Sequence, residues 1–148
     1  MLSGIDWLST GQAVSLRRRL RTSRVGLLSH RAATDRHGRG SFEVLDELGA
    51  TISLVLTPEH GFDGIAQAEE PVSVPARGDD VCPMFSLYGQ SLESLSPTDE
   101  QLSMMDLLVI DLVDVGSRYY TYVWTALLAL RAAARRGVHT VVLDRPNP

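Results

Sequence analysis

The sequence of 148 residues contains one cysteine, Cys82, so the chain cannot form an internal disulfide. The fold therefore does not depend on an oxidising compartment. Cys82 lies between Val81 and Pro83, and no cationic residue is nearer in the sequence than Arg77. A thiol becomes nucleophilic when positive groups lower its pKa. We therefore expect a buried, unreactive thiol rather than a catalytic one.

Long apolar runs and an excess of positive charge are also absent. No run approaches the ~20 residues that a membrane-spanning helix needs, and the N-terminal residues lack the basic and apolar regions of a signal peptide. We expect no membrane span and, by default, a cytoplasmic protein; a secreted or periplasmic location would require an upstream segment. The net charge of −4 and a pI of about 5.5 argue against nucleic acid as a partner. The arginine cluster at 17–21 is interpreted as a solvated helix face.

Several motifs of familiar sites are missing. The absence of G-x-G-x-x-G and of a Walker A sequence leaves nucleotide binding unsupported. The absence of H-E-x-x-H, H-x-x-x-H and paired cysteines disfavours a metal site, and the absence of G-x-S-x-G disfavours a serine hydrolase. We expect no cofactor and no metal. A metal-dependent hydrolase remains an alternative, because the residue types suit it: His30, Glu59, His60, Asp111 and Asp114.

The segments that are present alternate between strand-like and helix-like patterns. Strands are expected at 24–29, 51–56, 84–88, 106–111 and 138–144, and helices at 6–21, 41–48 (with Ser41 as its N-cap), from 97 onward and at 119–136. A long connection is expected at 57–83. The alternation predicts an α/β fold, a Rossmann-like three-layer domain with a mostly parallel sheet. Because the chain stops just past the strand-end residue Asp144, we expect residues 1–148 to be one domain of a longer protein, with a C-terminal domain missing.

Polar residues follow three of the apolar runs directly. The run 52–56 leads into Thr57-Pro58-Glu59-His60-Gly61-Phe62, the run 107–110 into Asp111 and the loop that follows it, and the run 141–143 into Asp144-Arg145-Pro146-Asn147-Pro148. The carboxyl ends of strands in an open parallel sheet are where ligands bind. The pattern therefore predicts one site rather than scattered surface residues.

The residues of this site suit proton transfer and anion binding. Glu59 at a partly shielded strand end is a candidate general acid or base, and His60 can orient substrate, share a proton or simply bond to backbone. Arg118 can clamp a carboxylate; the alternative is an internal pair with Asp111 or Asp114 that fixes the loop. Likewise, Asp144 and Arg145 can form a turn-stabilising pair. The four aromatic residues near the start of the expected last helix cannot all share one face, so some line the site and others pack in the core: Tyr119, Tyr120, Tyr122 and Trp124.

Taken together, these segments resemble the NamZ-type exo-β-N-acetylmuramidases. The resemblance runs from about Gly4 to Pro148 and rests on several motifs in matching order: residues 57–64, 67–70, 86–89, 111–122 and 143–148. It implies a Rossmann-like N-terminal catalytic domain that hydrolyses non-reducing-end N-acetylmuramic acid from peptidoglycan-derived muropeptides or disaccharides. It also implies a smaller C-terminal domain, with the site in the cleft between the two.

The resemblance assigns roles residue by residue. Glu59 corresponds to the catalytic glutamate and His60 to its neighbour. The pocket residues implied are Asp114, Arg118, Tyr119, Tyr120 and Tyr122, to which we add the strand-end residues His30, Asp111, Asp144 and Asn147 as candidate substrate contacts. The chain departs from the family pattern at Ser29, Asp63 and Val113, which leaves the substrate range open. A non-catalytic muropeptide-binding module is a second alternative.

Overall fold

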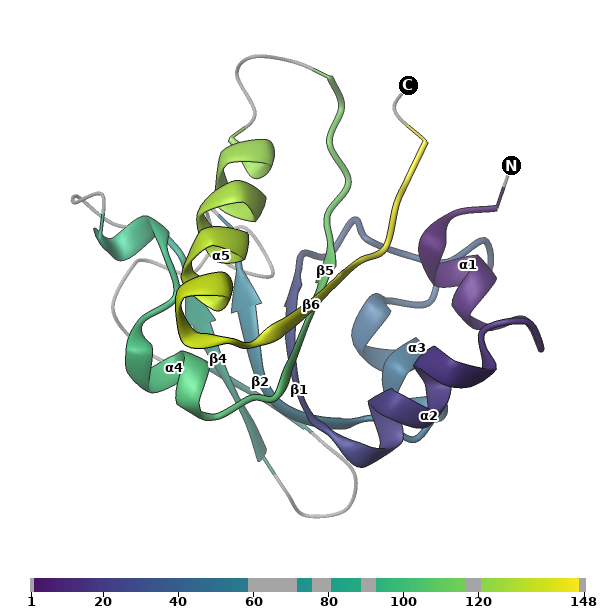
Figure 1. Ribbon diagram of the computed structural model, residues 1–148. Helices are drawn as coiled ribbons and strands as arrows, with labels where there is room; N and C mark the ends of the chain where they lie inside the picture. Colours follow the sequence, from purple (N-terminus) through teal and green to yellow (C-terminus); the bar gives the residue numbers. More distant parts are fainter. Residues whose placement is uncertain (1, 59–71, 76–80, 89–92, 117–120, 147–148) are drawn as a thin grey trace.

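Six strands form one sheet in the order β3-β4-β2-β1-β5-β6 (Figure 1). The strands are β1 (Arg24–Ser29), β2 (Thr51–Thr57), β3 (Val72–Pro75), β4 (Val81–Ser86), β5 (Leu107–Asp111) and β6 (His139–Val142). All neighbouring pairs are parallel except β3–β4. This computed structural model describes residues 2–58, 72–75, 81–88, 93–116 and 121–146. The predicted mostly parallel α/β sheet is confirmed.

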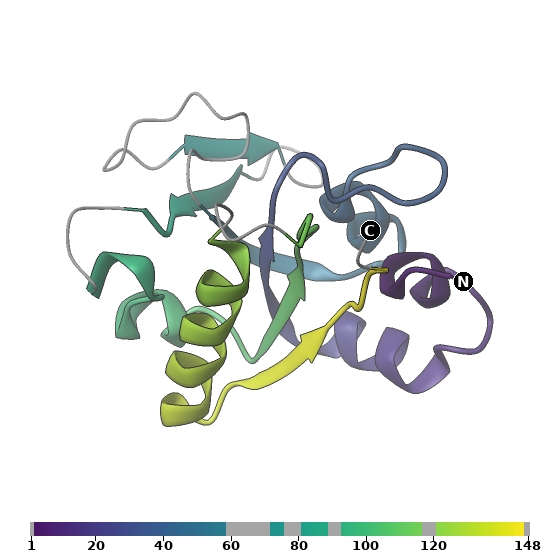
Figure 2. The same ribbon diagram turned by 90° about the horizontal axis from the view of Figure 1, so that it is seen from above.

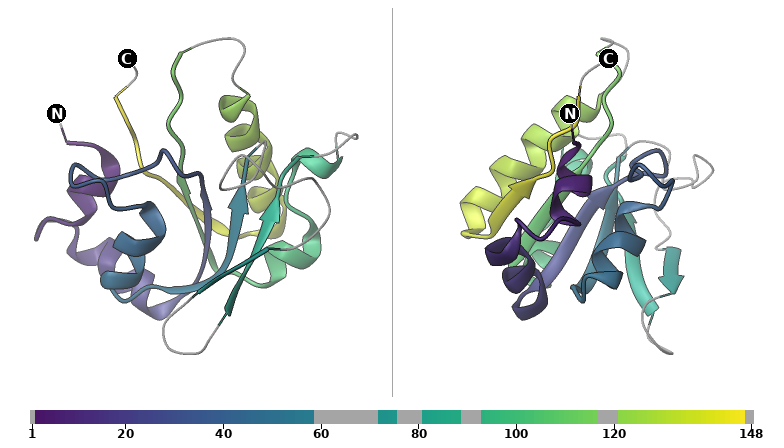
Figure 3. Two further views of the ribbon diagram at one scale, coloured as in Figure 1. Left: turned by 180° about the vertical axis from the view of Figure 1, so that it is seen from behind. Right: turned by 90° about the vertical axis from the view of Figure 1, so that its right-hand side faces the viewer.

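Helices cover both faces of the sheet, so the domain has three layers (Figure 2). One face carries α1 (Gly4–Leu8), α2 (Val14–Thr22) and α3 (Ser41–Glu47). The other carries α4 (Asp99–Ser103) and α5 (Tyr122–Arg136), with a 3-10 helix, η1, at Glu93–Leu95. The view from behind separates the two groups of helices in the same way (Figure 3).

The central strands are buried on both faces because both faces are covered. In β5, Leu107 and Val109 pack towards α1–α3, whereas Leu108 and Ile110 pack towards α4 and α5. All five residues of β5 are buried. A strand buried on both sides is continuously apolar rather than alternating, which explains why this run was recognisable in the sequence.

Three local predictions were wrong. The expected helix at 6–21 is two helices, α1 and α2, separated by Ser9–Ala13; the hydroxyl of Thr10 donates to the carbonyl of Trp7 and ends the first helix there. The connection expected at 57–83 contains β3 and the start of β4. Ser41 is the first residue of α3 rather than its N-cap, and the N-cap is Gly40.

Cys82 is buried, with 2% of its surface exposed, as predicted. Burial raises the pKa of its thiol to about 11. Such a thiol is protonated at neutral pH and is therefore a poor nucleophile. Within the described ranges, no helix has the length and apolar character needed to cross a membrane.

Candidate functional site

The strand order creates a switch point between β1 and β5. From β1 the chain passes through α3 to β2, which lies beside β1 in the sheet. From β5 it passes through α5 to β6, which lies beside β5 in the opposite direction along the sheet, and α5 covers the face opposite to α3. In open α/β sheets, ligands bind at the carboxyl ends of the strands at such a point. Ser29 ends β1 directly opposite Asp111, which ends β5. The candidate site is therefore the region around these two strand ends.

Asp111 anchors a buried polar network at this point. Its carboxylate is fully buried, and both of its oxygens accept hydrogen bonds from Arg145, from Nε at 2.5 Å and from Nη2 at 2.9 Å. Ser41 at the start of α3 also lies 2.5 Å from Asp111 Oδ2 and accepts a hydrogen bond from Ser29 at 3.2 Å. Arg145 Nη1 additionally donates to the carbonyl of Thr34 at 2.9 Å. The network joins the ends of β1 and β5 to the segment after β6.

His30 lies directly after β1 and is 9% exposed. Its Nε2 accepts a hydrogen bond from the backbone N–H of Val113 at 2.9 Å. Its ring is also 4.8 Å from the ring of Tyr122, centre to centre, with the planes tilted by 53°. Burial lowers the pKa of His30, the Asp111 carboxylate acts to raise it, and the Arg145 guanidinium lowers it further; the net direction is downward. His30 is therefore neutral at neutral pH.

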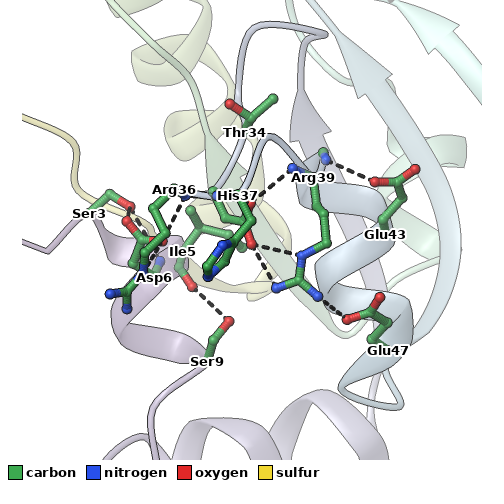
Figure 4. A network of polar contacts seen from close by, with 12 residues as sticks. Ser3, Ile5, Asp6, Ser9, Thr34, Arg36, His37, Arg39, Glu43 and Glu47 are labelled. Atoms are coloured by element: carbon green, nitrogen blue, oxygen red, sulfur yellow. Dashed lines mark hydrogen bonds and ion pairs between the residues drawn. The ribbon is translucent and has the colours of Figure 1, made fainter.

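The loop between β1 and α3 is held by its own polar contacts (Figure 4). Arg39 binds Asp35 through Nε and Nη2 at 2.9 Å and 2.7 Å, and it also pairs with Glu47 on α3. The carboxylate of Asp6 accepts from the backbone N–H of Arg36 at 3.0 Å. Although burial raises the pKa of Asp35, hydrogen bonds from Arg39 and from the backbone of His37 lower it below its ordinary value. The loop that carries His30 is thus a braced element.

Two other predicted site residues, Asp114 and Asp144, lie in the segments that follow β5 and β6. Asp114 is partly buried and accepts a hydrogen bond from the backbone N–H of Gly116 at 2.6 Å, which forms a local turn. Asp144 is exposed, and its carbonyl accepts from the N–H of Gly4 at 2.6 Å. The backbone after β6 is therefore held by Gly4 on one side and, through Arg145, by Asp111 on the other.

Of the predicted site residues, the structure brings three together at the β1–β5 switch point: His30, Asp111 and Tyr122. Asp114 follows Val113, which donates its backbone N–H to His30, and its carboxylate accepts from Gly116 in a local turn. Asp144 is also described, exposed in the segment after β6. The remaining six predicted residues lie outside the described residues: Glu59, His60, Arg118, Tyr119, Tyr120 and Asn147. The segment that leads to Glu59 is described as far as Pro58. Thr57 ends β2, is fully buried, and accepts a hydrogen bond at its carbonyl from Leu87 at 2.7 Å.

Sequence reasoning missed Arg145 and Ser41. The sequence offers a local pair with Asp144 as one possibility for Arg145, and it indicates a helix cap at Ser41. A spacing rule does not reveal either contact, because Arg145 is 34 residues and Ser41 is 70 residues from Asp111. The available signal was the presence of an arginine and an aspartate at the ends of two successive apolar strands, which meet at one edge of a parallel sheet.

Two buried hydroxyls near this edge have no hydrogen-bond partner among the described residues: Ser86 at the end of β4 and Thr121 just before α5. Among the residues that the structure describes, no three histidine, cysteine, aspartate or glutamate side chains lie close enough together to hold a metal ion.

The chain is similar to proteins of one known family. Residues 25–148 match the family described as "Exo-beta-N-acetylmuramidase NamZ, N-terminal". The chain is 36% identical over 147 residues to the peptidoglycan beta-N-acetylmuramidase NamZ of Bacillus subtilis (strain 168). The match covers 99% of this chain and 34% of that relative, so the chain spans about a third of the length of the curated relative.

Solved structures show the same fold. One DUF1343 family protein of Bacteroides fragilis superposes with a TM-score of 0.79 at 32% identity, and covers 99% of this chain and 35% of its own. A second from the same organism has a TM-score of 0.73 at 24% identity with the same coverage, and supports the fold alone. Because the family match covers residues 25–148 and the 32% identical structure shares the fold, the chain belongs to the NamZ N-terminal (DUF1343) family.

Proposed function

We propose that this chain is the catalytic domain of an exo-β-N-acetylmuramidase that releases N-acetylmuramic acid from the non-reducing end of peptidoglycan fragments. The observation that carries the proposal is the 36% identity over 147 residues to a peptidoglycan beta-N-acetylmuramidase. A site at the β1–β5 switch point supports it, because that is the ligand-binding edge of such a sheet.

In this proposal Glu59 is the general acid. It follows β2, the neighbour of β1 in the sheet, by two residues. Glycoside hydrolysis passes through an oxocarbenium-like transition state, and a carboxylic acid that protonates the leaving oxygen makes the departure of the aglycone easier. His60 is its partner in orienting the substrate or holding the proton.

The reaction needs a second group that activates water or attacks the sugar. Asp111 is poorly suited to that role, because its carboxylate is fully buried and both oxygens are bound by Arg145. Asp114 is a better candidate, since it lies partly exposed in the segment after β5. Glu69 and the acetamido group of the substrate itself are the other candidates.

Recognition of N-acetylmuramic acid requires a group for its lactyl carboxylate. Arg118 is the proposed clamp, because a guanidinium binds a carboxylate through two parallel hydrogen bonds. Among the described arginines at this edge, Arg145 already binds Asp111 and Thr34, so it supports the site rather than reading the ligand.

The test compares two chromogenic substrates that differ only at the lactyl group, an N-acetylmuramide and the matching N-acetylglucosaminide, on the full gene product. The proposal expects turnover of the muramide and little of the glucosaminide. Binding of the muramide without turnover would favour a binding module. Loss of turnover on chelation, restored by a divalent metal, would favour a metal-dependent hydrolase.

A further inference from the structure

His30 contacts two described parts of the chain, the residues just after β5 and the first residue of α5. Near the start of that segment, Val113 donates its backbone N–H to His30 Nε2 at 2.9 Å. At its end, Tyr122, the first residue of α5, lies with its ring 4.8 Å from the imidazole. Val113 and Tyr122 are nine positions apart in sequence, whereas His30 comes from a different strand end. One side chain therefore contacts both the backbone just after β5 and the start of α5.

The hydrogen bond fixes the protonation state of His30. A backbone N–H can donate only to a ring nitrogen that carries a lone pair, so Nε2 is unprotonated and the single ring proton is on Nδ1. Protonation of Nε2 would place two N–H groups against each other and remove the bond. The contact with Val113 therefore exists only in the neutral imidazole.

The position of His30 is itself fixed. The carbonyl of His30 accepts from the N–H of Ala33 at 2.9 Å, and the rest of its loop is braced by the Asp35–Arg39 contacts. An anchor can hold a neighbouring segment only if it does not move itself. The braced β1–α3 loop meets this condition.

We propose that neutral His30 is a positioning residue that holds Val113 and Asp114, just after β5, and Tyr122, at the start of α5, in the arrangement that binds substrate; we call its two contacts the latch. Asp114 directly follows Val113, and its carboxylate accepts a hydrogen bond from the backbone N–H of Gly116 at 2.6 Å. A shift of Val113 therefore displaces that carboxylate. The inference rests on the proposed function for its substrate readout, whereas its geometry stands without it.

The latch makes substrate binding depend on pH. The groups that face His30 are Asp111 on β5, Arg145 after β6 and Tyr122 on α5. Burial, the largest influence, lowers the pKa of His30 below its ordinary value of 6.5. The hydrogen bond between Val113 and His30 is therefore present above pH 6.5, and it is lost as the pH falls through the lowered pKa of His30. One pH unit below that pKa about one molecule in eleven is neutral, so the apparent affinity falls by about tenfold.

The first measurement needs no substrate. In the full gene product labelled with ¹⁵N-valine and ¹³C-histidine, the amide resonance of Val113 is expected to titrate with the same midpoint as the His30 ring. His30→Gln retains an acceptor that does not titrate, so it should abolish the titration of Val113. The matched control is His37→Gln, at an exposed histidine of the same loop, which should leave it unchanged. A Val113 amide that does not follow His30 in the unmodified protein overturns the latch.

The second measurement tests whether the latch serves the site. With a chromogenic N-acetylmuramide, kcat/KM should fall on the acid side in the unmodified protein with the midpoint of His30. This limb should be missing in His30→Gln. In His30→Ala, KM should rise at least tenfold at neutral pH, because the contact with Val113 is lost. An acid limb unchanged in His30→Gln overturns the role in binding. Absence of turnover on every muramide would count against the proposed function, and the Val113 titration then judges the latch alone.

Discussion

Arg145 binds both carboxylate oxygens of Asp111, at 2.5 Å and 2.9 Å, where Asp111 has no exposed surface and the Arg145 side chain is 12% exposed. The pair connects the end of β5 to the segment after β6. Removing one partner from a buried pair leaves the other charge without compensation, which is far more costly than losing a pair at the surface.

We expect Arg145→Ala to lower the free energy of unfolding by about 3–5 kcal/mol. The same strand offers a matched control, since Asp106, just before β5, is bound by Arg24 at 2.7 Å in a pair about half exposed on both sides. Arg24→Ala should therefore change the stability only slightly. Urea unfolding of both variants makes the comparison. Equal effects of the two substitutions would show that the Asp111–Arg145 pair contributes no more than a surface contact.

Gly4 allows the first helix to lie against the segment after β6. A Cβ at this position would be 2.6 Å from the backbone carbon atoms of Leu143 and 2.7 Å from the backbone nitrogen of Asp144. We expect Gly4→Ala to push the two segments apart, to break the Gly4–Asp144 hydrogen bond, and to cost about 1–3 kcal/mol. Thermal unfolding measures the loss.

The control for that substitution is Gly11→Ala, because a Cβ there meets nothing within 4 Å. It should leave the midpoint of unfolding unchanged or slightly raised, since alanine restricts the unfolded chain. A Gly4→Ala variant as stable as Gly11→Ala would mean that the contact between α1 and the segment after β6 is dispensable.

The central strands could be predicted because their signal is local. The strands β1, β2 and β5 are short apolar runs bounded by polar residues, and the structure has them within one residue of their predicted limits. A helix was expected from 97 onward, and α4 begins at Asp99 after Thr98, whose side chain accepts a hydrogen bond from the N–H of Gln101 at 3.2 Å. In both cases the information lies within a few neighbouring residues.

The features that were missed depend on the assembled sheet. The strand β3 contains Pro75, which local rules assign to a loop, but β3 is an edge strand that pairs only with β4, and such a strand tolerates proline. The contact between Asp111 and Arg145 likewise requires β5 and β6 to be neighbours. Within the described residues, the sequence placed His30 and Asp111 at strand ends that meet, but it did not indicate the side chains that hold Asp111 there.

Glu59 is the proposed general acid, and a substrate with a poor leaving group tests that proposal. A natural disaccharide needs protonation of its glycosidic oxygen, whereas an activated chromogenic aglycone needs little. Glu59→Gln keeps the size of the side chain and removes the acid, so the loss should be large on the disaccharide and smaller on the activated substrate.

The most direct measurement is the release of N-acetylmuramic acid from a disaccharide in which it is linked β-1,4 to N-acetylglucosamine, by the full gene product and by its Glu59→Gln variant. We predict that the unmodified protein releases both monosaccharides and that the variant is at least about a hundredfold slower, which is the usual contribution of general acid catalysis. No release by the unmodified protein, or near-normal release by the variant, would contradict the account.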